Sequence, residues 1–131
     1  MKRGASPALC LTLLAAVGCS GSPGSTSPVC TMEFRYGLSV YVKDSLTGAA
    51  IASGASLVVR DGAFKDSVSH PSGRPELNAL PLLTAGERAG TYQISVSKPG
   101  YLPWSRSSVR ITANECHVNP ASVTALLQPS T

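Results

Sequence analysis

A strict two-residue alternation of apolar and polar side chains most constrains how this chain can fold. In residues 90–98 (GTYQISVSK) the apolar Tyr92, Ile94 and Val96 alternate with polar side chains, and residues 36–43 (YGLSVYVK) repeat the pattern. Successive side chains of a β-strand point to opposite faces of the sheet. Each segment therefore predicts a strand that buries one face and exposes the other.

Other β-capable segments follow at the spacing of short turns. Asp61-Gly62 separates two of them and predicts a tight hairpin, because glycine accepts the positive φ of a two-residue loop. Residues 70–85 contain three prolines and no clean period, so we expect a short edge strand or an extended cover segment that buries its four leucines. With that segment as a seventh, the expected strands are residues 36–43, 55–60, 63–69, 90–98, 107–112 and 121–127.

The composition supports the same fold class. A chain of 131 residues, 43% of them hydrophobic, has material for one domain with a single core. Twelve glycines and ten prolines favour many short elements joined by turns, and no window after residue 30 has the period of an amphipathic helix. We therefore predict an all-β fold, a Greek-key β-sandwich of about seven strands, over residues 34–129.

Residues 1–18 have the parts of an export signal. A positively charged start precedes an uncharged apolar run, residues 8–17 (ALCLTLLAAV), which is too short to span about 30 Å of hydrocarbon as a helix. Residues 16–19 (AVGC) resemble the bacterial lipobox, in which small residues precede a cysteine that receives a diacylglyceryl group. The resemblance implies that Cys19 is lipidated and begins the mature chain. An ordinary secretory signal is the alternative.

Residues 19–33 are expected to form the lipidated N-terminus and a tether. Residues 20–29 are rich in Ser, Gly and Pro, which cannot bury enough apolar surface to fold. Fully extended, these ten residues reach about 33 Å. Ser20 stands where an acidic residue would resemble an inner-membrane retention signal, so we expect a lipid-anchored protein of the cell envelope, in the outer membrane and facing the periplasm or the surface.

Cysteine parity predicts a disulfide. Of the four cysteines, Cys10 lies within the export signal and Cys19 is assigned to lipid, which leaves Cys30 and Cys116 in an oxidising compartment. We expect these two to pair, which would fasten the exit of the tether to the sandwich. Two buried or free thiols are the alternative.

Several short motifs occur together in one order. Residues 40–51 (VYVKDSLTGAAI), 54–58 (GASLV), 90–96 (GTYQISV) and 98–101 (KPGY) resemble, in sequence and spacing, the carboxypeptidase regulatory-like domain. The resemblance covers residues 36–128 and implies a transthyretin-like β-sandwich. In carboxypeptidases this domain is an accessory beside a separate zinc catalytic domain, so the zinc chemistry is not implied here.

The turn residues of these motifs have structural explanations. Asp44 and Thr47 can accept hydrogen bonds from the turn backbone, and Gly48 can take the positive φ that closes the turn. Gly100 permits a second reversal after its proline.

We find no catalytic or metal-binding pattern, and we expect neither an enzyme nor a cofactor. His70 and His117 have no spacing typical of a metal site or a triad, and no serine lies in G-x-S-x-G. The hydroxyisourate hydrolase branch of transthyretin-like proteins carries a histidine before the first turn and ends in Tyr-Arg-Gly-Ser, and both signatures are absent. A small-ligand-binding or hydrolytic protein with a hidden pocket remains the alternative.

Binding is the remaining class of function. Tyr101, Trp104 and Arg106 lie together in a predicted loop, a composition suited to a sugar ring, a peptide or a neighbouring protein. The plainer expectation is that Trp104 covers one end of the core. We expect a structural or interaction module that docks to an envelope protein or glycan.

The charge balance argues against nucleic acid as a partner. Removing Lys2 and Arg3 with the export signal leaves nine basic residues against seven acidic ones, a net charge of about +2. The basic residues are scattered singly and form no stripe beside stacking aromatics.

Overall fold

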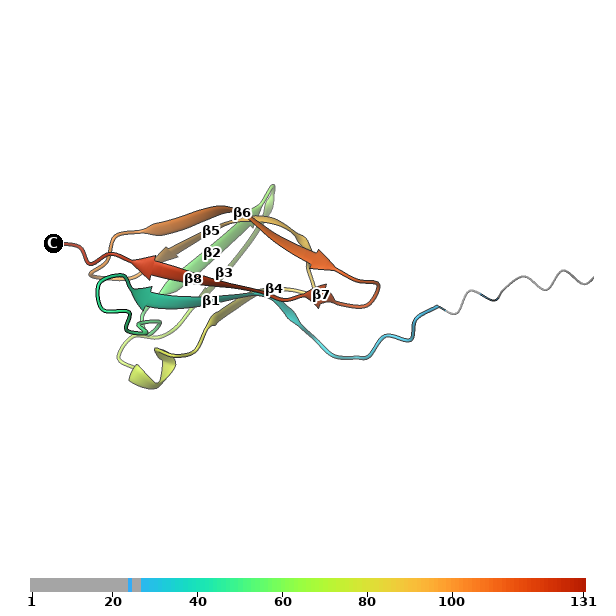
Figure 1. Ribbon diagram of the computed structural model, residues 1–131, viewed down its shortest axis with the longest axis horizontal. Helices are drawn as coiled ribbons and strands as arrows, with labels where there is room; N and C mark the ends of the chain where they lie inside the picture. Colours follow the sequence, from blue (N-terminus) through green and yellow to red (C-terminus); the bar gives the residue numbers. More distant parts are fainter. Residues whose placement is uncertain (1–23, 25–26) are drawn as a thin grey trace, which may run out of the picture.

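Two β-sheets pack face to face in the computed structural model, which describes residue 24 and residues 27–131 (Figure 1). A single three-residue 3₁₀ turn, η1 (Pro75–Leu77), interrupts the strands. The strands are β1 (Tyr36–Asp44), β2 (Ser56–Asp61), β3 (Phe64–Ser69), β4 (Leu82–Gly86), β5 (Gly90–Ser97), β6 (Trp104–Ala113), β7 (Val118–Asn119) and β8 (Ala121–Leu127). The predicted all-β sandwich is confirmed. The structure has one strand more than the seven predicted. This strand, β7, has only two residues, too few for an alternation to show in the sequence.

The smaller sheet joins the first and last strands of the domain. Its order is β4-β1-β8, with β1 antiparallel to β4 and parallel to β8. The larger sheet has the order β3-β2-β5-β6-β7, and all its pairs are antiparallel. The N-terminal segment enters near β7, and the C-terminus leaves at the opposite end of the sandwich (Figure 1).

The core is formed by the inward-facing members of each alternation. Tyr92, Ile94 and Val96 of β5 are all buried, as are the alternating residues of β8. Burying this apolar surface is the main favourable contribution to folding. The alternation in the sequence therefore identifies the inner face of each sheet correctly.

The segment of residues 70–85 departs from one expectation. It ends in β4, which forms an edge of the smaller sheet as predicted, but among its leucines only Leu82 is fully buried. Leu80 and Leu83 are 50% and 37% exposed. Leu83 follows Leu82 along a strand and so points to the outer face. The expectation that all four leucines are buried was wrong.

Two boundaries also differ. The hairpin loop consists of Gly62 and Ala63, since Asp61 pairs with Phe64, and Gly62 has a φ of 57°. Strand β6 begins at Trp104 rather than at residue 107, because the polar run before residue 109 hides a strand that continues through a register shift against β5. The shift accommodates one extra residue on β6, as in a β-bulge.

The export signal (residues 1–18) and the lipidation residue Cys19 lie outside the described residues. Among the residues that the structure describes, no helix is long and apolar enough to cross a membrane.

Candidate functional site

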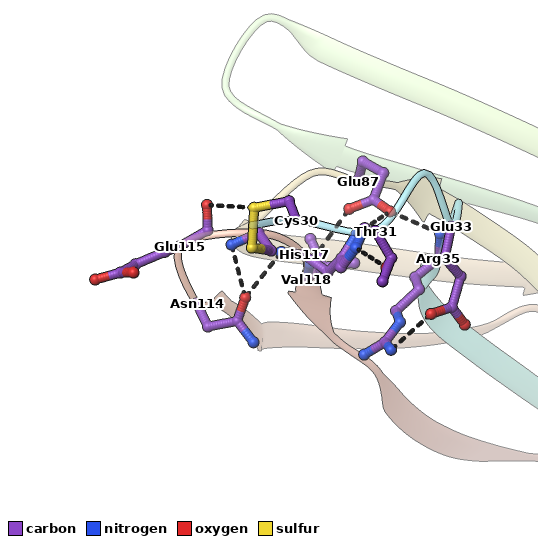
Figure 2. Close-up of polar contacts among 10 residues, drawn as sticks. Cys30, Thr31, Glu33, Arg35, Glu87, Asn114, Glu115, His117 and Val118 are labelled. Carbon is purple, nitrogen blue, oxygen red and sulfur yellow. Dashed lines mark hydrogen bonds and ion pairs between the residues drawn. A yellow bond between two sulfur atoms is a disulfide. The ribbon is translucent and has the colours of Figure 1, made fainter. Parts of the chain in front are cut away.

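The N-terminal segment is fastened to one end of the sandwich, and this junction is the most highly connected polar site of the described chain (Figure 2). Cys30 forms a disulfide with Cys116, with 5.2 Å between their Cα atoms. Cys116 lies in the loop between β6 and β7. The predicted disulfide is confirmed, and it attaches the chain six residues before the first strand begins.

A second fastening runs through His117, whose side chain is only 10% exposed. Its Nδ1 lies 2.9 Å from Oε1 of Glu87, and its Nε2 lies 3.1 Å from the hydroxyl of Thr31. A carboxylate can only accept, so Nδ1–H donates to Glu87 and, in the neutral ring, Nε2 accepts from Thr31. The imidazole therefore links the N-terminal segment to the residue that follows β4.

Glu87 is the hub of this junction. Its carboxylate accepts the backbone N–H of Arg35 at 2.8 Å and that of Val118 at 3.4 Å, in addition to His117. Burial acts to raise the pKa of the Glu87 carboxyl, but the hydrogen bonds from His117, Arg35 and Val118 outweigh burial and hold the pKa below its ordinary value of 4.5. The charged carboxylate thus joins three segments of the chain.

The loop that presents Cys116 and His117 is itself ordered by Asn114. The Oδ1 atom of Asn114 accepts the backbone N–H of Cys116 at 2.9 Å and of His117 at 2.8 Å. Asn favours such local side-chain bonds in turns.

An exposed ion pair between Glu33 and Arg35 at 2.8 Å adds little to stability, because solvent screens it.

The junction has the order of groups found in a nucleophile, base and carboxylate chain, namely Thr31, His117 and Glu87. Such a chain also needs free donors for a developing oxyanion. The backbone N–H groups of four neighbours already donate to Glu87 or Asn114 side chains: Arg35, Cys116, His117 and Val118. These four N–H groups are therefore not free to stabilise an oxyanion.

A hollow beside the disulfide is not lined by these three side chains. A surface hollow of about 440 Å³ beside the disulfide is lined by Pro28, Asn114, Glu115 and Cys116. None of the three triad-like side chains lines it. A substrate in this hollow would not face the imidazole.

The opposite end of the sandwich holds the turn residues predicted from the sequence. Oδ1 of Asp44 accepts the backbone N–H of Leu46 at 2.8 Å and of Thr47 at 3.0 Å. The hydroxyl of Thr47 accepts the N–H of Ala49 at 3.2 Å. These hydrogen bonds from Thr47 and Leu46 lower the pKa of Asp44 against the effect of burial.

The two glycines assigned to turns have the expected backbone conformation. Gly48 has a φ of 72° and Gly100 a φ of 82°. An added Cβ would meet nothing within 4 Å at either position, so the requirement for glycine comes from the backbone alone.

Tyr101, Trp104 and Arg106 differ in burial and in contacts. The hydroxyl of Tyr101 donates to Oδ2 of Asp44 at 3.0 Å, and its ring packs on the core. Trp104 is half-buried against the core, as the plainer expectation had it, and it also lines a hollow of about 260 Å³ together with Leu102, Pro103, Leu126 and Gln128. Arg106 is exposed and does not line that hollow. Of the three, Trp104 is the residue that lines this hollow.

Sequence reasoning missed Glu87 and underestimated His117. His117 lies in the loop before β7, and its side-chain contacts come from segments far away along the chain. The adjacency of His117 to a disulfide cysteine is the one local signal that could have drawn attention to it. Glu87 has a φ of 46°, which no pattern in the sequence indicates.

No cluster of three or more His, Cys, Asp or Glu side chains in the described part of the chain is placed to hold a metal ion. His70 lies apart from the junction residues along the chain, at the end of β3, and its Nδ1 is buried without a hydrogen-bond partner there.

The protein was also compared with known families and with curated proteins: no family model matches the chain, and no curated protein matches it.

Proposed function

We propose that this chain is an envelope lipoprotein, anchored through Cys19, whose sandwich acts as a non-enzymatic structural or interaction module. The Cys30–Cys116 disulfide carries the proposal. Disulfides persist in exported, oxidising compartments, and this one lies where a membrane tether would join the folded domain. The outer membrane is the proposed destination.

The contacts of the junction support a mechanical role for this end of the molecule. The disulfide and the Thr31–His117–Glu87 chain give the N-terminal segment a covalent and a hydrogen-bonded attachment within two residues of each other. The spacer of residues 20–29 then sets the reach from the membrane at about 33 Å. The sandwich would therefore be attached to the membrane through one of its ends, and the rest of its surface would be available to a partner.

We further propose that the domain belongs with the carboxypeptidase regulatory-like, transthyretin-like sandwiches. The support is the sequence order of the Asp44–Gly48 turn, the β5 strand and the Gly100 turn, together with two sheets of three and five strands. The hydrogen bond from the Tyr101 hydroxyl to Asp44 links the Gly100 turn to the Asp44–Gly48 turn.

The anchor is tested by metabolic labelling with a fatty acid. We expect labelled wild-type protein in the membrane fraction, and we expect Cys19→Ser to lose both label and membrane association. Cys10→Ser is the matched control, because it lies in the removed signal and should change neither. Unlabelled wild type outside the membrane fraction would contradict the anchor and favour an ordinary secretory signal.

The interaction role is tested by crosslinking in intact membranes. Trp104→Ala and Leu102→Ser both alter the hollow of about 260 Å³ and should reduce recovery of an envelope protein or glycan. Leu46→Ser, at a side chain that is 78% exposed and outside the hollow, is the control. Equal recovery from all four proteins would contradict a role for this hollow.

One observation favours the hydrolytic alternative, namely the Thr31–His117–Glu87 chain. An activated ester tests it. Turnover that Thr31→Val and His117→Gln both abolish, without loss of the fold, would establish it. The occupied backbone donors around the imidazole predict no such turnover.

A further inference from the structure

The larger sheet turns one side to the core and the other to solvent. The solvent side, which we call the outer face, is formed by the residues of β2, β3, β5 and β6 that alternate with the core residues. The strand register identifies its members, because directly opposed residues point to the same side of a sheet. Exposed hydroxyl groups recur on this face, as at Ser67, Ser95 and Ser105, which share one row across the sheet.

Three exposed cations lie among these polar side chains: Arg60 on β2, Lys65 on β3 and Arg110 on β6. Arg60 directly opposes Lys65 on one side and Gln93 on the other. Arg110 opposes Thr91 on β5, and β6 lies two strands from β2, about 10 Å across the sheet. The fold thus brings to one face cations that stand singly along the chain.

No acidic residue of the described strands lies on the outer face. Asp61 and Asp66, the acidic residues of β2 and β3, alternate onto the opposite side. There Asp61 accepts from Arg88 at 2.8 Å, and Asp66 accepts from the hydroxyl of Thr84. Strands β5 and β6 contain no acidic residue. The outer face is therefore purely cationic.

The opposition of Arg60 and Lys65 is unfavourable for the domain alone. Like charges directly opposite each other on neighbouring strands destabilise a sheet. No ion pair within the part of the chain that the structure describes includes Arg60, Lys65 or Arg110. A bound anion would offset the repulsion, so this charge pattern is complementary to an anionic ligand.

The third cation borders a concave surface. A hollow of about 520 Å³ is lined by residues 89–91 and 110–113, which include Thr91, Arg110 and Thr112. Both threonines are exposed, and their hydroxyls can donate or accept hydrogen bonds. The guanidinium presents a planar set of donors that matches a carboxylate. The hollow therefore offers one position for an anionic group, and the Arg60–Lys65 pair offers a second.

The uncharged groups of the outer face indicate which anion fits. Faces that bind a membrane combine cations with apolar side chains that enter the lipid, and sites for single-stranded nucleic acid combine them with aromatic rings. Of the large apolar side chains that are exposed in the described chain, none lies on the outer face. Its serine and threonine hydroxyls and the Gln93 carboxamide instead suit the hydroxyl groups of sugars.

We propose that the outer face binds a glycan that carries carboxylate groups. Arg60 and Lys65 hold one carboxylate, and Arg110 holds a second in the hollow. Gln93 and Thr91, which lie between these two positions on β5, bond the hydroxyls of the intervening sugar. The site rests on the interaction role proposed above and gives the partner a chemical class, but neither the anchor nor the hollow beside Trp104 takes part in it.

Binding of polygalacturonate to the full-length protein tests the requirement for charge. Its methyl ester is the matched control, because the ester has the same sugar chain without the carboxylate charge. In titration calorimetry we expect the acid to bind at least about tenfold more tightly than the ester, and added salt to weaken the binding. Equal affinity for the two polymers, or binding of neither, would overturn the proposal.

A pair of double variants tests the site. Arg60→Gln combined with Lys65→Gln should weaken binding of polygalacturonate at least about tenfold, while the thermal midpoint stays the same or rises because the repulsion is gone. Lys43→Gln combined with Arg106→Gln removes the same charge from exposed positions outside the outer face and should leave binding unchanged. Equal weakening by both double variants would show that net charge, rather than this site, attracts the polymer.

Vesicles test a membrane as the competing partner of the outer face. Wild type and the Arg60→Gln, Lys65→Gln double variant should bind phosphatidylglycerol and phosphatidylcholine vesicles alike. A preference for phosphatidylglycerol that the double variant loses, without binding of polygalacturonate, would replace the glycan by a membrane surface.

Trp104→Ala separates this site from the interaction role on which it rests. The variant should retain full affinity for polygalacturonate, because Trp104 lies outside the outer face. If wild type does not bind polygalacturonate but still yields a crosslinked partner that Trp104→Ala loses, the outer-face site is wrong and the interaction role stands.

Discussion

At each end of strand β1 a carboxylate accepts hydrogen bonds that order a chain reversal, but the donors come from different parts of the chain. At the C-terminal end, Asp44 accepts two backbone N–H groups and the hydroxyl of Tyr101. Beyond the N-terminal end, Glu87 accepts two backbone N–H groups and the imidazole N–H of His117. In both places one carboxylate orders a chain reversal and an aromatic side chain from a distant segment completes it.

The difference lies in where the backbone donors come from. Those of Asp44 are two and three residues away, whereas those of Glu87 are 52 and 31 residues away. A local set can form as soon as the turn forms. A remote set requires the sandwich to be assembled, because its loop-closure entropy is repaid only by the rest of the fold. The junction end is therefore the end that depends on tertiary structure.

Removing the Cys30–Cys116 disulfide at the junction should have the largest effect on the free energy of unfolding. Cys30→Ser combined with Cys116→Ser opens a loop with a sequence separation of 86. The chain-entropy model gives a loss of about 4 to 5 kcal/mol in the free energy of unfolding. Denaturant unfolding measures this loss, and a reductant should destabilise wild type but not the double variant. Equal stability of the two proteins would show that the disulfide does not constrain the unfolded chain.

The glycine turns at the Asp44 end should respond next. Gly48→Val and Gly100→Val each place a β-branched residue at positive φ and should cost more than about 1 kcal/mol in the free energy of unfolding. Gly48→Asn is the matched control and should cost less, because Asn tolerates this conformation. If valine and asparagine behave alike at position 48, backbone strain is not the reason for glycine there.

Acidification should weaken both ends through their carboxylates. The pKa of Glu87 is below 4.5 and that of Asp44 below 3.8, so each carboxylate stabilises the fold above those values and its contribution is lost as the pH falls through the lowered pKa. Glu87→Gln and Asp44→Asn should each flatten the fall in stability on the acid side, measured by denaturant unfolding at a series of pH values. If the pH dependence of stability is unchanged in either variant, the carboxylate replaced in it does not contribute to the acid sensitivity.

The smallest effects should come from the single hydroxyls that complete each end. Tyr101→Phe removes the bond to Asp44 from a half-buried ring and should cost about 1 kcal/mol in the free energy of unfolding. Thr31→Val removes the bond to His117 on an exposed segment and should cost about 0.5 kcal/mol. Thermal unfolding compares the two, and a larger loss for Thr31→Val would reverse the order of the two ends.

Features that depend on near neighbours along the chain could be predicted from the sequence. Alternation identified the buried face of the strands, because side-chain direction in a strand repeats every two residues. The Asp44 turn and the positive φ of Gly48 were predictable for the same reason, since their hydrogen bonds close within a few residues. Parity sufficed for Cys30 and Cys116, once the other two cysteines were assigned elsewhere.

Contacts between residues far apart along the chain could not be predicted from the sequence, because they follow from the packing of the two sheets. The pairing of β1 with β8 and the place of Glu87 between Arg35 and Val118 both depend on how the sheets stack and in which register. The position of β8 at one side of the smaller sheet depends on it as well, because its sequence resembles that of its neighbours. Contacts of this kind leave no periodic trace in the chain.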